Sequence, residues 1–283
     1  GSRYSQSDSG FRVTTFESAG TTKMKRLHKL LTFLMLTLFA LSVGERPVRG
    51  QDNDSVELRV LTYNIHHGEG TDGIFDYDRL AKIMASTSAD VIAIQEVDNG
   101  TQRAGGTNQA AELGKRLKMD HAFGNALYFS NGEYGEAILS RFPISSVQAH
   151  HLPFRHGQEP RTALAVTVSP GNGLPAFKFV GTHLCHQDEE TRTDQTRELD
   201  GLFAKSPIPV ILAGDLNAKP ESAAMKVLES NWMDSHSPRS KIDYILIRKT
   251  DAWEIVSTRV LDKPLASDHD PVLTVLKWNK RSD

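Results

Sequence analysis

Residues 51–283 predict one α+β domain, because many strand-like runs are interspersed with only a few helical patterns. Alternating or continuous apolar runs, separated by Gly and Pro clusters, predict strands at 57–63, 91–94, 126–129, 137–139, 144–151, 162–168, 177–182, 210–213, 242–248, 253–260 and 272–278. Helices are predicted after the cap Asp76, over 108–117 and over 189–205. Since no internal repeat or long linker interrupts this region, we expect a single sandwich domain.

The first 50 residues have a different pattern. Basic residues from Lys23 onward precede a 14-residue apolar run, Leu30 to Val43, which is short for a membrane span. We therefore interpret residues 24–50 as a signal peptide cleaved before Gln51, and residues 1–23 as upstream or vector-derived sequence. This predicts a secreted or periplasmic protein. An uncleaved membrane anchor is the alternative.

Charge and cysteine content narrow the class of protein. Residues 51–283 carry 25 of the 33 Lys and Arg residues and 32 of the 35 Asp and Glu residues, a net charge of −7. An acidic balance does not favour non-specific binding to nucleic acid, which depends on Lys and Arg. It does not exclude a phosphate substrate, because a bound cation inverts the local field. The single cysteine, Cys185, excludes an intramolecular disulfide, which fits a bacterial periplasm or exterior.

Polar residues follow five of the buried strands. The apolar run 210–213 breaks into Gly214-Asp215-Leu216-Asn217, which on its own is equally a turn signal. The other endings carry the same kind of side chain: Asn64, Glu96, His183 and the turn Ser267-Asp268-His269. Because functional groups collect where strands end in loops, this repetition indicates a site.

These residue types suit metal-assisted hydrolysis. Glu96 and Asp268, with Asn64 nearby, offer the oxygen ligands that Mg²⁺ prefers. His269 suits a general base, since the pKa of histidine is ~6.5, and Asp243 is a suitable partner to orient its ring. A structural salt bridge from Asp243 to Lys241 or Arg248 is the alternative.

In this order and spacing, the motifs around Asn64, Glu96, His183, Asp215, Asp243 and His269 resemble the endonuclease/exonuclease/phosphatase superfamily. The resemblance covers essentially all of 51–283. It implies a four-layer sandwich of two packed, mixed β-sheets flanked by helices.

The resemblance also implies roles for individual residues. Glu96 is similar to the metal-binding glutamate of the family, with Asn64 beside it and Asp268 near the metal, which would be Mg²⁺ or Mn²⁺. Asp215 matches the aspartate that orients or deprotonates the attacking water, and Asn217 the asparagine that contacts phosphoryl oxygens. His269, polarised by Asp243, matches the active-site histidine. His183 matches a second histidine, which contacts the phosphate or assists the leaving group.

The segments 63–68, 135–141 and 159–161 are most similar to small exported bacterial members and to a domain of eukaryotic lipid-remodelling relatives. Arg161 is then a candidate clamp for a substrate phosphate, or else a surface arginine. Glu136 is a candidate partner for His183. The segment 234–241 is shorter than in relatives, which leaves the substrate open.

Three alternatives compete with a metal phosphoesterase. Cys185 suggests a thiol nucleophile, although no other feature supports one. Four histidines, His66, His67, His183 and His186, suggest a zinc site without tight ligand spacing. A non-catalytic module that binds a phosphate ligand is the third. The complete set of roles favours a secreted Mg²⁺-dependent phosphodiesterase, expected as a monomer without an obligate protein partner. Its substrate would be a phospholipid head group, a small phosphodiester or nucleic acid, with a non-specific secreted nuclease as the nearest alternative.

Overall fold

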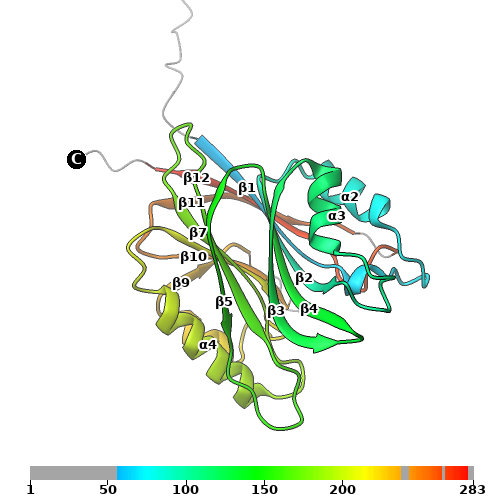
Figure 1. Cartoon of the computed structure of the whole chain (residues 1–283). Coiled ribbons are helices and arrows are strands. Elements are labelled where there is room, and N and C mark those ends of the chain that lie inside the picture. Colours follow the sequence, from blue (N-terminus) through cyan, green and yellow to red (C-terminus); the bar gives the residue numbers. More distant parts are fainter. Residues whose placement is uncertain (1–55, 237–241, 263–264, 280–283) are drawn as a thin grey trace, which may run out of the picture. The chain divides into compact units, whose positions relative to one another are not determined.

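Two six-stranded sheets pack face to face in the computed structural model, which describes residues 56–236, 242–262 and 265–279 (Figure 1). The first sheet has the order β11 (Trp253–Val260), β12 (Val272–Trp278), β1 (Val56–Asn64), β2 (Val91–Asn99), β4 (Gly132–Ser140) and β3 (Asp120–Phe129). The second has the order β5 (Ile144–His151), β6 (Thr162–Val168), β7 (Phe177–His183), β8 (Val210–Asp215), β10 (Asp243–Arg248) and β9 (Trp232–Asp234). The predicted signal peptide and the residues 237–241 of the short loop lie outside the described residues.

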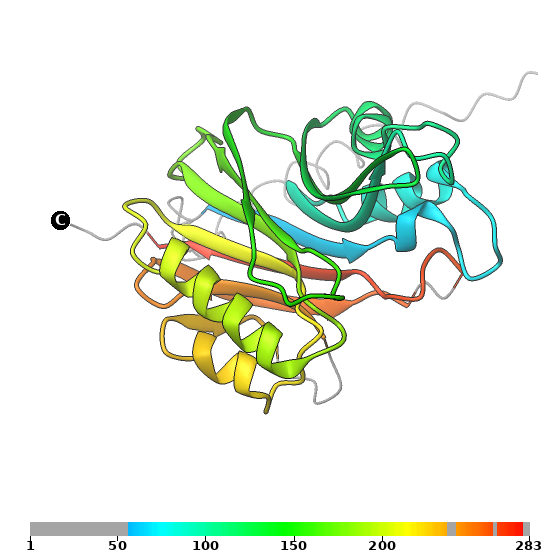
Figure 2. The same ribbon diagram turned by 60° about the horizontal axis from the view of Figure 1, so that its bottom comes forward.

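Helices cover the outer face of each sheet (Figure 2). On the first sheet lie α2 (Tyr77–Ser86) and α3 (Gln109–Leu117), and on the second α4 (Glu189–Phe203) and α5 (Ala223–Leu228). A single 3₁₀ turn, η1 (His66–Gly68), follows β1. Both sheets mix parallel and antiparallel pairs. The predicted α+β four-layer sandwich is therefore confirmed.

Three apolar layers hold the domain together. The central one lies between the sheets and includes Val60, Ala93, Phe179 and Ile211, all fully buried. The two outer layers pack the helices onto the sheets, for example through Leu199 of α4. Because central strands such as β8 are covered on both faces, they read as continuous apolar runs rather than alternating ones. Each large side chain buried in this way contributes about 1.5–3 kcal/mol.

Local signals explain where most helices begin. The carboxylate of Asp76 accepts a hydrogen bond from the backbone of Arg79, and this cap starts α2 as predicted. Asn108 and Asp188 cap α3 and α4 in the same way. The short α5, capped by Ser222, and the three-residue β9 were not predicted, because elements of this length carry little periodicity.

The register of the second sheet places three polar residues side by side. His183 at the end of β7 pairs with Asp215 at the end of β8, and Asp215 pairs with Asp243 at the start of β10. In the first sheet, Asn64 of β1 pairs with Gln95 of β2. Residues that are far apart in sequence are therefore adjacent because the backbone ladders fix them there.

The path of β2 differs from the prediction. We expected the strand to end at Gln95-Glu96, but it continues to Asn99 with an irregularity between Ile94 and Val97. At this bulge Glu96 adopts a left-handed backbone conformation, with φ of 58°. A bulge re-aims a side chain, and such bulges are frequent next to active sites.

The described part of the chain contains no helix long and apolar enough to cross a membrane.

Replacing Gly214 by Ala tests the tight contact between β8 and β7. A Cβ atom at this position would lie 1.9 Å from the carbonyl oxygen of Thr182, so the backbone must shift next to Asp215. We expect the free energy of unfolding in urea to fall by about 2 kcal/mol or more. The matched control is Gly201→Ala on α4, where no atom lies within 4 Å and alanine favours the helix. Equal stability of the two variants would contradict the close contact.

Candidate active site

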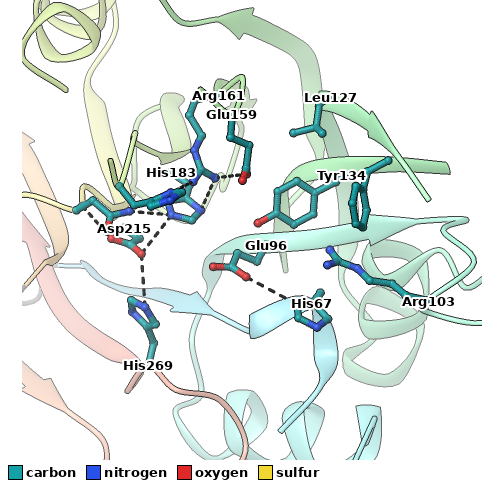
Figure 3. A pocket seen from close by; sticks show the side chains of 13 residues that line it. His67, Glu96, Arg103, Leu127, Tyr134, Glu159, Arg161, His183, Asp215 and His269 are labelled. Carbon is teal, nitrogen blue, oxygen red and sulfur yellow. Dashed lines mark hydrogen bonds and ion pairs between the residues drawn. The ribbon is translucent and has the colours of Figure 1, made fainter. Parts of the chain in front are cut away.

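Polar side chains from both sheets meet in one pocket of about 330 Å³ (Figure 3). Its wall is formed by His67, Glu96, Arg103, Leu127, Phe129, Tyr134, Glu159, Arg161, His183, His186, Asp215, Asn217 and His269. Six of the predicted site residues are therefore in the wall: Glu96, Arg161, His183, Asp215, Asn217 and His269. The other three, Asn64, Asp243 and Asp268, adjoin it.

Asn64 connects the two sheets beneath the pocket. Its side-chain nitrogen donates to Glu96 Oε1 at 3.0 Å and to Asp215 Oδ2 at 3.2 Å. Its Oδ1 accepts a hydrogen bond from the backbone nitrogen of His66 at 3.0 Å, which fixes the orientation of the amide. Asn64 is fully buried. In this arrangement it positions two carboxylates rather than presenting its own oxygen to the pocket.

Glu96 is the carboxylate of the first sheet that faces the pocket. Its Oε2 lies 3.9 Å from Nδ1 of His67. Burial raises the pKa of Glu96, but the contacts with His67 and Asn64 outweigh it and hold the pKa below the ordinary value. Glu96 is therefore an anion at neutral pH, as a metal ligand must be.

Asp215 and His269 are the central pair of the second sheet. Oδ2 of Asp215 lies 3.6 Å from Nε2 of His269 and 3.4 Å from Nε2 of His183. The other ring nitrogen of His269, Nδ1, lies 3.0 Å from Oδ2 of Asp243. Asp243 therefore contacts His269 and not Arg248, which pairs with Asp251. Asp215 is additionally held by the backbone nitrogen of Asn217, 2.9 Å from Oδ1.

The surroundings of Asp215 and His269 shift the pKa values of both groups. Burial lowers the pKa of His269, but the hydrogen bond and charge of Asp243, with the charge of Asp215, outweigh it and raise the pKa to about 9. Burial and the charge of Asp243 raise the pKa of Asp215 to about 7. Because the two groups interact, their titrations belong to the pair rather than to either residue alone.

His183 is held from both sides. Its Nδ1 lies 3.0 Å from Nη1 of Arg161, and its Nε2 lies 2.9 Å from the side-chain nitrogen of Asn217. Burial and the positive charge of Arg161 hold the pKa of His183 well below its ordinary value, so the ring is neutral at pH 7. Glu136 was a candidate partner for His183. In the structure Arg161 occupies that place instead.

Arg161 is a buried residue of the pocket and not a surface arginine. Its exposed fraction is 2%, and it contacts Glu159 at 2.9 Å and His186 at 3.2 Å in addition to His183. Glu136 is buried close enough to feel the charge of Arg161, and burial raises the pKa of its carboxyl well above the ordinary value. Among the residues that the structure describes, none offers a hydrogen bond to Oε2 of Glu136. A guanidinium in this position suits a phosphoryl oxygen.

Asp268 stands outside the pocket wall. It is exposed, and its Oδ1 accepts from the hydroxyl of Ser267 at 3.3 Å. Its negative charge contributes to the raised pKa of His269. Ser267 also donates to the backbone oxygen of Asn64 at 2.7 Å, which ties the turn before β12 to the end of β1.

The two alternative chemistries have no geometry to support them. Within the described ranges, the group of acidic and imidazole side chains close enough to share one ion is Asp215, Asp243 and His269, not the four histidines of the zinc alternative. Cys185 is buried, and the pocket wall does not include it. Its backbone nitrogen is bound by Gln195 instead.

A divalent cation fits this donor set. Hard cations take carboxylate oxygens together with waters and substrate phosphate oxygens. Glu96 supplies one carboxylate that faces the pocket, and Asn64 holds it in place. Asp215 supplies a second nearby carboxylate, linked to the first through the same amide.

The sequence analysis missed the wall opposite the acids. This wall is formed by Arg103, Leu127, Phe129 and Tyr134, none of which is a polar residue directly after a buried strand. Glu159, which pairs with Arg161, was also not predicted in the pocket. One signal was available for Tyr134, which shares a strand face with Glu136 two positions later. Nothing in the local pattern identifies Arg103 or Phe129.

Two packed sheets that bring these acids and imidazoles together at one pocket are the arrangement of a phosphoesterase. The chain belongs to the endonuclease/exonuclease/phosphatase family, whose model matches residues 61–269.

Among curated proteins, the chain is similar to YbhP of Escherichia coli (strain K12), described as uncharacterized, at 28% identity over 170 residues. That match covers 56% of this chain and 66% of YbhP, so the chain spans just under two thirds of that relative.

Two solved structures share the fold at low identity. The human Nocturnin catalytic domain with bound sulfate anion has a TM-score of 0.65 at 22% identity, covering 80% of this chain and 97% of that chain. A mannosyl-6-phosphatase from Bacteroides thetaiotaomicron VPI-5482 has a TM-score of 0.61 at 18% identity, covering 77% of this chain and 98% of that chain.

Replacing Asp243 by Asn tests how His269 is charged. Loss of the anion disfavours the imidazolium, so the pKa of His269 should fall from about 9 toward the ordinary value or below it. The measurement is an NMR titration of the histidine ring protons in the metal-free protein. The exposed His151 serves as the internal reference, because it lies outside the pocket. An unshifted His269 titration would show that Asp243 does not set its charge.

Proposed function

We propose that this protein is a secreted, Mg²⁺-dependent phosphodiesterase that cleaves a P–O bond by attack of water. The observation that carries the proposal is that Glu96 and the Asp215–His269 pair line one pocket together with Arg161 and Asn217. An anionic metal ligand, a group that handles a proton and donors for phosphoryl oxygens are the parts that phosphoester hydrolysis needs.

Glu96 would hold the cation, with Asn64 fixing its carboxylate and Asp268 near the outer side of the site. When bound, Mg²⁺ would neutralise negative charge that develops on the phosphoryl oxygens. The low pKa of Glu96 supports this assignment, since a ligand that is already ionised binds a cation without first losing a proton.

Asp215 and His269 handle the proton of the attacking water. Asp215 accepts hydrogen bonds from the Asn64 side chain and the Asn217 backbone, so it is held in a fixed position at the end of β8. Nε2 of His183 and Nε2 of His269 lie 3.4 and 3.6 Å from its Oδ2. Asp243 holds the His269 ring with Nε2 toward Asp215 and the pocket. Because the raised pKa of His269 keeps its ring protonated at neutral pH, Asp215 is the member of the pair that accepts the proton of the attacking water.

Asn217, His183 and Arg161 bind the phosphoryl group. Asn217 is turned into the pocket by a left-handed backbone conformation, with φ of 47°. The neutral ring of His183 and the guanidinium of Arg161 lie together on the same side of the pocket. These groups donate hydrogen bonds to non-bridging oxygens or to the departing oxygen, which stabilises charge in the transition state.

The substrate class follows from the pocket and the charge of the chain. A pocket of about 330 Å³ suits a small phosphoester or a head group. The acidic balance of residues 51–283 makes a non-specific secreted nuclease the weaker candidate. A phosphomonoesterase is a second candidate, supported by the shared fold of the mannosyl-6-phosphatase from Bacteroides thetaiotaomicron. A non-catalytic binding module is disfavoured, because a residue for each step is present.

Hydrolysis of a chromogenic phosphodiester by residues 51–283 tests the proposal. We expect activity that EDTA abolishes and Mg²⁺ restores, with Mn²⁺ as a comparison. The variant Glu96→Gln should need at least about tenfold more Mg²⁺ for half-maximal rate, because it weakens a metal ligand. Glu57→Gln, an exposed acid on the same strand as Asn64, is the control. Turnover that survives EDTA would refute metal dependence, and turnover of only a monoester would select the phosphomonoesterase.

Replacing His269 by Ala tests the proton-handling pair. We expect kcat to fall by about 100-fold or more, the scale of general acid–base catalysis. His151→Ala, in an exposed position on β5, should leave kcat unchanged. Wild-type turnover in the His269 variant would remove this residue from the mechanism.

A further inference from the structure

The pocket wall opposite the acids has a different chemistry. It is formed by Leu127 and Phe129 of β3, Tyr134 of β4 and Arg103 from the loop after β2; these four residues are called the ring wall here. Figure 3 shows the Tyr134 side chain projecting toward the centre of the pocket, with Arg103 on the far side from Asp215 and His269. None of the four takes part in the proposed steps at phosphorus.

Arg103 is locked in place by a buried acid. Its Nε and Nη2 donate to the two carboxylate oxygens of Asp98 at 2.7 and 2.9 Å. Asp98 is fully buried and also accepts from the hydroxyl of Thr101 at 2.8 Å. The pair fixes the plane of the guanidinium and offsets its charge. A second phosphate is therefore a poor occupant of this half of the pocket.

Two aromatic rings pack against the guanidinium of Arg103. The guanidinium carbon lies 4.6 Å from the ring centre of Phe129 and 5.3 Å from that of Tyr134. Its Nη1 makes no hydrogen bond to the residues that the structure describes. The result is a fixed cluster in which the guanidinium lies over both rings, with unused N–H donors on Nη1.

We propose that the ring wall binds a planar aromatic ring carried by the organic group of the phosphoester. Flat rings stack on aromatic and guanidinium faces, and the free N–H donors suit an acceptor at the ring edge. This inference rests on the proposed function, because it places the phosphoryl group at the acids of the same pocket. The ring belongs to a nucleoside base or to a simpler aryl group, which share this chemistry.

Phe129 also determines how far the ring wall reaches. It is 43% exposed and lines a second, neighbouring hollow of about 370 Å³ together with Tyr128 and residues 130–133. A ring stacked on Phe129 therefore sits at the exit of the catalytic pocket. Tyr128, which is 81% exposed, lines the second hollow but not the catalytic pocket.

The test compares ligands that differ only in aromaticity. Binding of benzyl phosphate, cyclohexylmethyl phosphate and adenosine 5′-monophosphate is measured by calorimetry on residues 51–283 with saturating Mg²⁺. We expect benzyl phosphate to bind about fivefold more tightly than cyclohexylmethyl phosphate, the scale of one aromatic contact. Phe129→Leu, which keeps an apolar side chain but removes the ring, should abolish this preference. Phe129→Tyr should restore it.

Tyr128→Ala is the matched control, an aromatic residue of the same hairpin outside the catalytic pocket, and it should keep the preference. Adenosine 5′-monophosphate distinguishes a nucleoside base from a simpler aryl group. If it binds more tightly than benzyl phosphate, and this advantage is lost in Phe129→Leu, the ring is a nucleoside base. Equal affinity for the aromatic and saturated ligands, unchanged by Phe129→Leu, overturns the ring wall. Ring-dependent binding without hydrolysis of any phosphoester would instead contradict the proposed function and leave the ring wall in place.

Discussion

One carboxamide, that of Asn64, holds the two halves of the site in a common frame. It donates to Glu96 from the sheet that contains its own strand and to Asp215 from the opposite sheet, 151 residues later in the chain. The contact is possible only because the two sheets pack closely through a buried apolar layer. Relative sliding of the sheets would separate Glu96, the proposed cation ligand, from Asp215 and His269, the proposed proton-handling pair. The packing of the two sheets therefore determines the distance between Glu96 and Asp215. A change in one would change the other.

The parts of the pocket differ in how firmly they are held. His183, Asp215 and Asp243 occupy adjacent positions of three paired strands, so backbone ladders determine their spacing. The ring wall comes from a hairpin and a loop, which tolerate changes of length and sequence. Arg103 is the exception within that wall, because buried Asp98 fixes it. Under the proposed function, this division would let the ring wall change without moving the residues that act at phosphorus.

Sequence patterns identified the fold and most of the polar half of the site. Continuous apolar runs identified the buried strands. The polar residues at the strand ends, Asn64, His183 and Asp215, identified the pocket, because pairing with neighbouring strands fixes where each strand ends. Glu96 was found for a partly wrong reason, since it lies at a bulge inside β2 rather than at its end. The contact between Arg161 and His183 was not predictable, because it depends on how a loop after β5 crosses the sheet. Phe129 and Arg103 were not predicted, because residues at a hairpin end and in a loop do not follow a periodic pattern in the sequence.

The left-handed backbone of Glu96 lowers the stability of the fold, although the same residue supplies a carboxylate to the pocket. A glutamate with φ of 58° costs the fold about 1–2 kcal/mol, and its carboxylate is also largely removed from water. Glycine or asparagine would relieve the backbone, and both would remove the carboxylate. A library of variants sorted for thermal resistance alone would therefore enrich such replacements at position 96 and accumulate well-folded proteins without the proposed cation ligand. For engineering this scaffold, position 96 has to be excluded from randomisation, whereas exposed glycines such as Gly201 are free to change.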